Sequence, residues 1–186
     1  MKKVVLVLVM VALTFGMNAQ VSYGEYSQGK VSMVVEKGKN QGMIYLDLNS
    51  KGTYGLILKN GEGEGFIEFL QSNFNKFTEW AVVAEEKRVT ELTKKTGSIR
   101  QAGFFKYGGW KFGTSNLSIS MNIQDGKIRA YLYGSKIQSS SNQYIKSDSV
   151  LFFIDQEIID ELKSILSPDK INEFLTSRNN ADKLFN

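Results

Sequence analysis

One stretch decides the fold, Gly65-Phe-Ile-Glu-Phe-Leu-Gln-Ser-Asn-Phe-Asn-Lys-Phe-Thr-Glu-Trp-Ala-Val-Val-Ala84, because its apolar residues recur mostly three or four positions apart. This spacing places side chains on one face of a helix, so we expect a helix over about residues 65–85. Its aromatic rings need a broad surface to cover them, and the flanking segments have strand patterns. The sequence therefore predicts a helix lying across a sheet. The face expected to be buried carries Phe66, Phe69, Leu70, Phe74, Phe77 and Trp80.

The rest of the chain favours strands, with helices at the C-terminal end. Apolar or alternating runs at 31–35, 43–48, 54–58, 98–106, 117–123, 127–133 and 150–154 are separated by turn residues. Asp155 is placed to cap a helix and Pro168 to begin another. We expect a loop at 61–65, a mobile loop or a hairpin tip at 135–147, a frayed tail at 179–186, and either helix or loop at 87–97. The predicted fold class is α+β, an antiparallel β-sheet with helices packed on one face.

The two halves of the chain resemble each other, which predicts a duplicated β-β-β-α unit with half-repeats at 21–97 and 98–178. Tyr23-Gly-Glu-Tyr26 aligns with Tyr107-Gly-Gly-Trp110, the run 31–35 with 117–121, and Tyr45-Leu46 with Tyr131-Leu132. Shared strand composition alone is the alternative explanation, because the identities are few.

The N-terminus has the pattern of a cleaved signal peptide. Lys2 and Lys3 precede an apolar run that is too short to span a bilayer, and Ala19 is a small residue suited to signal peptidase. We expect residues 1–19 to be removed, leaving 20–186 as a single α+β domain. The protein should then be exported to the periplasm or medium, without a membrane-spanning segment.

Charge and composition limit the classes of partner and of catalytic or metal site that the protein can have. The formal charge is +4, and removal of Lys2 and Lys3 with the signal peptide lowers it to +2. Such a nearly neutral chain with scattered charges predicts no nucleic-acid partner. The chain contains no histidine and no cysteine, which excludes Ser-His and Cys-His nucleophile pairs and His-Cys zinc sites. We expect no cofactor and no metal site.

Catalysis is only weakly indicated. Ser27-Gln-Gly-Lys30 spells S-x-x-K, but it lies among glycines ahead of a strand and lacks the partner motifs of penicillin-recognising enzymes. Glu25, Glu36, Asp47 and Asp125 are available carboxylates with no motif around them. A carboxylate-dependent hydrolase acting on a periplasmic glycan therefore remains the alternative function.

The leading function is a non-enzymatic module that binds a protein or glycan partner, such as an envelope component. If the aliphatic residues of the strands face the helices, the alternate positions project from the other face of the sheet. That face would carry Tyr45, Tyr131 and Tyr133, joined by Trp110, and tyrosine suits a recognition surface because it combines a stackable ring with a hydroxyl. Simple cross-strand pairing of these rings is the alternative.

Overall fold

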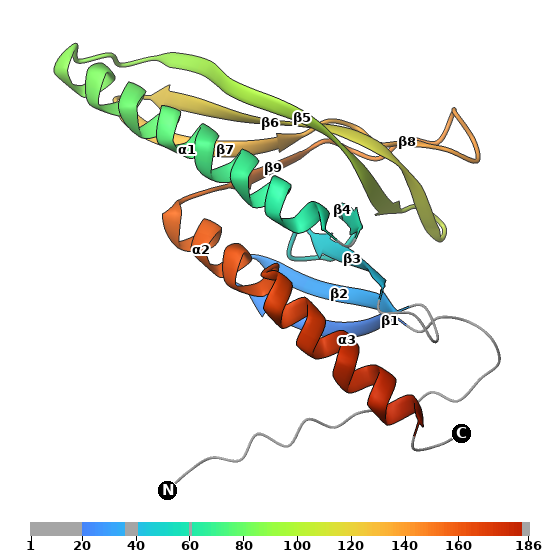
Figure 1. Cartoon of the computed structure of the whole chain (residues 1–186). Helices are drawn as coiled ribbons and strands as arrows, with labels where there is room; N and C mark the ends of the chain where they lie inside the picture. The colour runs from blue at the N-terminus through green and yellow to red at the C-terminus, as the bar shows by residue number, and fades with distance from the viewer. Residues whose placement is uncertain (1–19, 36–40, 60, 184–186) are drawn as a thin grey trace, which may run out of the picture.

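The structure is a computed structural model that describes residues 20–35, 41–59 and 61–183, and it has an α+β fold. A nine-stranded antiparallel sheet has two helices packing against it (Figure 1). The predicted signal peptide lies outside the described residues. In chain order the elements are β1 (Gln20–Tyr26), β2 (Gly29–Val35), β3 (Gly42–Asp47), β4 (Tyr54–Lys59), α1 (Glu62–Glu86), β5 (Leu92–Lys106), β6 (Trp110–Gln124), β7 (Lys127–Gly134), β8 (Gln138–Ser139), β9 (Val150–Phe153), α2 (Gln156–Ile165) and α3 (Pro168–Lys183).

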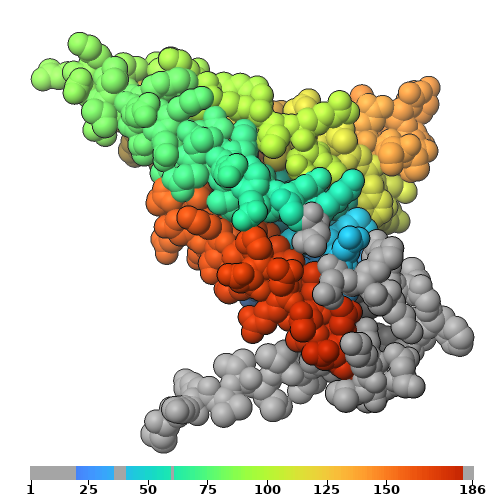
Figure 2. All heavy atoms as spheres, in the orientation of Figure 1, coloured from blue at the N-terminus to red at the C-terminus, as the bar shows by residue number. Residues whose placement is uncertain are grey.

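The strands follow one another across the sheet almost in chain order. Hydrogen-bonded neighbours run β1-β2-β3-β4-β5-β6-β7-β9, and the short β8 pairs with β6. Helix α1 is inserted between β4 and β5, which are themselves paired neighbours, and it crosses β4, β5, β6 and β7. Helix α2 contacts β1 and α1, and α3 packs beside α2. In Figure 2, α1 in green and α2 with α3 in orange and red cover the face turned to the viewer.

The core lies between the sheet and the helices. The register aligns Met33 of β2 with Ile44 of β3, and Ile44 with Leu58 of β4, and all three side chains are buried. In the second half of the sheet Ile119, Leu132 and Phe152 make an equivalent buried row across β6, β7 and β9. Because side chains alternate along a strand, the residues between these positions project from the other face, which we call the open face.

Helix α1 confirms the central prediction but starts earlier than expected. Phe66 and Leu70 are buried, Phe74 nearly so, and Phe69, Phe77 and Trp80 are half-buried. The loop expected at 61–65 is wrong, since the helix begins at Glu62. Gly63 is buried there, and a Cβ atom on it would lie 3.2 Å from the carbonyl oxygen of Leu166, so the glycine allows α1 to approach the end of α2.

Three other expectations need correction, and for a fourth segment the structure favours one of two alternatives. The segment 87–97 is mostly strand, because β5 starts at Leu92, and β5 and β6 form a long hairpin. The segment 135–147 fits the alternative of a hairpin rather than a mobile loop: Gln138 bridges Lys146 in antiparallel orientation, Ser139 pairs with β6, and Ile137 is fully buried. The tail from Asn179 is helical as far as Lys183. The first three expected strands, 31–35, 43–48 and 54–58, are preceded by a fourth strand, β1. Tyr23–Tyr26 is therefore strand, whereas the segment aligned with it, 107–110, starts with a turn.

The capping residues of the C-terminal helices were predicted correctly. The side chain of Asp155 accepts a hydrogen bond from the backbone N–H of Ile158 at 2.9 Å, and Pro168 is the first residue of α3. Proline suits that position because its missing N–H would have no partner within the helix.

Candidate functional site

An aromatic group lies on the open face near the hairpin that joins β5 and β6. Phe104 pairs with Phe112 across this hairpin, and the ring of Phe104 covers Gly55 of β4, where a Cβ atom would lie 2.5 Å from it. The Phe104 ring also contacts Tyr45 at 5.5 Å and Trp110 at 5.6 Å between centroids. Phe104 is buried by these neighbours, whereas Trp110 and Phe112 are 48% and 45% exposed. The side chains of Trp110 and Phe112 thus lie beside the buried Phe104 and are open to solvent.

The four residues predicted for the site fall into two separate groups. Tyr45 and Trp110 come together through Phe104. Tyr131 and Tyr133 lie on β7, which is separated from the β3 strand of Tyr45 by β4, β5 and β6. Tyr131 contacts the ring of Phe153 on β9 at 6.2 Å, and Tyr133 is 42% exposed. The structure therefore places all four on the sheet but does not gather them into a single cluster.

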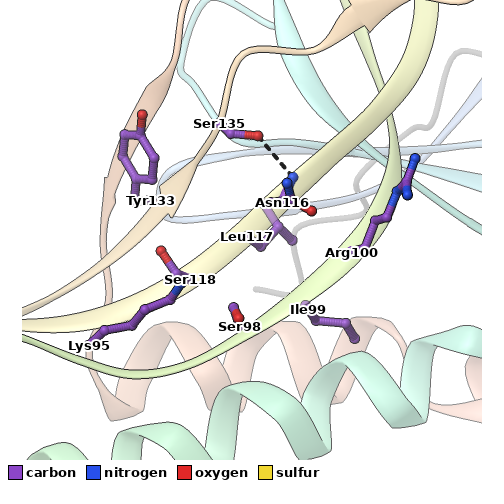
Figure 3. Close-up of a pocket in the computed structure, with 9 residues that line it drawn as sticks. All are labelled: Lys95, Ser98, Ile99, Arg100, Asn116, Leu117, Ser118, Tyr133 and Ser135. Atoms are coloured by element: carbon purple, nitrogen blue, oxygen red, sulfur yellow. Dashed lines mark hydrogen bonds between the residues drawn. The ribbon is translucent and has the colours of Figure 1, made fainter.

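A hollow of about 450 Å³ lies on β5, β6 and β7, between the two aromatic groups. Pairing of Ser98 with Ser118, and of Ser118 with Tyr133, forms a row of hydroxyl groups across these three strands. Figure 3 shows Tyr133, Ser118 and Arg100 pointing away from the helices that pass below. The polar and charged lining residues are Lys95, Ser98, Arg100, Asn116, Ser118, Tyr133 and Ser135, with no carboxylate among them.

Buried hydrogen bonds hold the far side of this hollow in place. The hydroxyl of Tyr54 donates to the backbone carbonyl of Ser135 at 2.7 Å and lies 2.7 Å from the hydroxyl of Ser115. Ser135 in turn accepts a hydrogen bond from the backbone N–H of Asn116 through its side-chain oxygen, at 2.9 Å (Figure 3). Arg100 is oriented by a hydrogen bond from Nη2 to the hydroxyl of Thr114 at 3.2 Å. The lining is therefore preorganised, with most guanidinium donors still free for a ligand.

Charge is segregated between the two layers of the molecule. Strands β5 to β9 contain seven lysine and arginine residues and no aspartate or glutamate, whereas α1 and α2 contain nine acidic and two basic residues. The near-neutrality of the whole chain therefore hides an uneven distribution of charge among its elements. By the strand register, the basic residues that share the open face are Lys95, Arg100, Lys106, Lys127 and Arg129.

A second hollow, of about 370 Å³, lies at the β1–β2 and β3–β4 turns. Glu25 and Asp47 both line it. Burial raises the pKa of the Asp47 carboxyl to about 6, although the nearby Lys30 lowers it. Lys30 Nζ also lies 3.4 Å from Glu25 Oε1, so this lysine is close to both carboxylates. Asp125 lies elsewhere, in the turn between β6 and β7, and Glu36 is outside the described residues.

The cationic and hydroxyl lining, above all Lys95, Arg100 and Ser118, is not among the residues predicted from the sequence. One signal could have found it: from Leu92 to Gln124 the sequence has no acidic residue. Within the described residues no group of three or more aspartates and glutamates is placed to hold a metal ion. Within the same ranges, none of the helices has the length and apolar character needed to cross a membrane.

Comparison with known proteins assigns the chain to no family. A scan against protein-family models, a search of curated proteins and a search of solved structures each returned no match. The function is therefore argued from the geometry and charge of the site itself.

Proposed function

We propose that this protein is a non-enzymatic binding module that holds an anionic partner, such as an envelope polymer, on the open face of β5, β6 and β7. The observation that carries the proposal is that five basic residues share the open face of β5, β6 and β7, strands that contain no aspartate or glutamate. A surface of one sign attracts ligands of the opposite sign and speeds their association. The acidic helices face the other way and repel the same ligands.

Exposed aromatic rings beside the basic hollow support the same reading. Trp110 and Phe112 are large, rigid and nearly half exposed, although burying such rings normally stabilises a protein. Arg and aromatic residues are the types enriched in recognition surfaces, where they supply contact area and directed hydrogen bonds. The combination fits a ligand that has flat rings able to stack on aromatic side chains and that also carries negative charge.

The proposal is tested by titrating the purified chain with anionic polymers at several salt concentrations. The double variant Lys95→Gln/Arg100→Gln removes two charges from the open face. The matched control Lys76→Gln/Lys163→Gln removes two exposed charges from α1 and α2. We expect salt-sensitive binding that is lost in the first variant and kept in the control. Absence of binding to every polymer, or equal loss in both variants, would contradict the proposal.

We further propose that the two halves are copies of one unit of four strands and a helix, β1–β4 with α1 and β5–β7, β9 with α2. The register supports this, because the open-face row Ser32–Tyr45–Ile57 has the counterpart Ser118–Tyr133–Leu151. In this alignment Tyr45 corresponds to Tyr133 rather than to Tyr131. An experimental structure in which the two units superpose strand by strand, with those rows coinciding, would support it, and a different strand order would exclude it.

A carboxylate-dependent hydrolase acting on a glycan is the second candidate, favoured by the hollow that Glu25 and Asp47 line. General acid catalysis needs a carboxyl that stays protonated near neutral pH beside one that does not, and the raised pKa of Asp47 fits the first role. The test is hydrolysis of soluble glycans by the purified chain and by Asp47→Asn. Activity that disappears in Asp47→Asn would favour the enzyme, whereas absence of activity in both would exclude it for those glycans.

A further inference from the structure

The chemistry of the open face narrows the class of ligand, on the assumption that the proposed binding function holds. The hollow offers two cations, Lys95 and Arg100, against five neutral polar side chains, four of which carry hydroxyl groups. Hydroxyl and amide groups pair with the hydroxyls of a sugar, whereas a phosphate or sulfate on every unit calls for a cation at every unit. The lining therefore matches a ligand with more hydroxyl groups than charges.

The charged end of that ligand is best a carboxylate. A guanidinium presents a planar fork of N–H donors that matches two oxygens of a carboxylate or of a phosphate, and a carboxylate carries only one charge, which suits a hollow with two cations. One nitrogen of Arg100 already donates to Thr114 at 3.2 Å, which fixes the plane of the group and leaves its other donors available. Asn116, paired directly with Arg100, can donate or accept beside it.

The aromatic rings supply the second half of the site. Phe104 follows Arg100 by four residues on β5, about 13 Å along the strand, and pairs with the exposed Phe112. Trp110 lies just beyond, at the start of β6. The apolar face of a sugar ring can cover such side chains while its hydroxyls remain in water. Charge recognition and stacking are thus separated along one strand pair, at a spacing that an oligosaccharide can bridge.

We propose that the open face of the β5–β6 hairpin binds an acidic glycan in which uronic acids alternate with neutral sugars. A uronate carboxylate pairs with Arg100, hydroxyls of the sugars bond to Ser98, Ser118 and Tyr133, and a sugar further along the ligand stacks on Trp110 and Phe112. Lys95 adds attraction at the other end of the hollow. The five open-face cations then give long-range attraction, and the hollow and rings give selectivity.

The test measures the affinity of the full purified chain for four probes: hyaluronan oligosaccharides, neutral dextran, heparin and single-stranded DNA. The variants are Arg100→Gln, Trp110→Ala and the control Tyr144→Ala, which removes a ring that is 87% exposed on a separate loop. Thermal melting of each variant checks that it is folded.

We expect hyaluronan to bind more tightly than the other three, with a loss of roughly tenfold or more in Arg100→Gln and in Trp110→Ala and no change in Tyr144→Ala. Binding to hyaluronan that is no tighter than to heparin or DNA, or that is unchanged in Trp110→Ala, overturns the assignment of ligand class and leaves anionic binding in place. Binding to none of the anionic probes overturns the proposed function as well.

Discussion

Gly97 in β5 lies directly against the side chain of Asn73 in α1. A Cβ atom on Gly97 would collide with Oδ1 of Asn73 and would lie 2.8 Å from its Cγ and 3.0 Å from its Nδ2, with no other residue's atoms among the three nearest. Gly97 also follows a register shift in the pairing of β5 with β6. Asn73 is buried, and its Oδ1 has no hydrogen-bond partner. The absence of a Cβ atom at Gly97 therefore allows α1 to approach β5 closely at this point.

The contact predicts strong coupling between the two positions. Gly97→Ala should cost about 1–3 kcal/mol of unfolding free energy, as overpacking does in a filled core. Asn73→Ala alone should cost little, because the loss of the Nδ2 hydrogen bond to the carbonyl of Phe69 at 2.8 Å is offset by removal of an oxygen that is buried without a partner. In the double variant the cost of Gly97→Ala should largely disappear. Urea unfolding of the four proteins measures this cycle, and additive effects would show that the two residues are not in contact.

Alanine substitutions on the sheet-facing side of α1 should lower the free energy of unfolding by amounts that depend on how deeply each side chain is buried. Phe66 is 2% exposed, so Phe66→Ala should cost about 3–5 kcal/mol. Phe77 is only half-buried at the edge of the core, so Phe77→Ala should cost clearly less. Chemical denaturation of both variants measures the difference. Equal losses would contradict the placement of Phe77 at the margin.

The buried hydroxyl of Tyr54 predicts a link between the core and the hollow. Tyr54→Phe removes hydrogen bonds to Ser115 and Ser135, and should lower stability by about 1–2 kcal/mol. Because Ser135 lines the hollow, the same variant should also weaken ligand binding. Calorimetric titration beside thermal melting separates the two effects. Unchanged affinity would show that Tyr54 does not position the site.

Asp47 predicts a pH-dependent effect on stability. Its pKa is raised by burial to about 6 from an ordinary value of 3.8, so folding with Asp47 ionised is unfavourable. Its contribution is fully present below about pH 4 and falls as the pH rises through about 6. Asp47→Asn should therefore raise the melting temperature at pH 8 and give little or no gain at pH 4. A gain that is equal at both pH values would contradict the raised pKa.

Helix α1 could be predicted from sequence because the three- and four-residue spacing of its apolar side chains depends on local helix geometry alone. Phe66 and Leu70 were correctly expected in the core, and Asp155 and Pro168 were correctly expected at helix starts. The start of α1 was missed because three glycines in 61–65 have low helix propensity, and only the tertiary contact of Gly63 with Leu166 shows why a glycine is needed in the helix.

The candidate site could be predicted only in part. Alternation along each strand correctly separates the open face from the core, but it does not say which strands are neighbours. Tyr45, Tyr131 and Tyr133 are grouped by alternation because all three lie on the face opposite the core, whereas three strands separate Tyr45 from the other two. Arg100 and Lys95 were overlooked because net charge was counted over the whole chain instead of by element.

The most direct test of acidic-glycan binding on the open face is to map ligand contacts by amide chemical shifts, in NMR spectra of the chain titrated with hyaluronan oligosaccharide. We expect the largest changes at Ser98, Arg100, Asn116, Ser118 and Tyr133, smaller changes near Trp110, and no changes at the amides of α1 and α2. Changes centred on Glu25 and Asp47 at the β1–β2 and β3–β4 turns, or spread over the helices, or absent at saturating ligand, would contradict it.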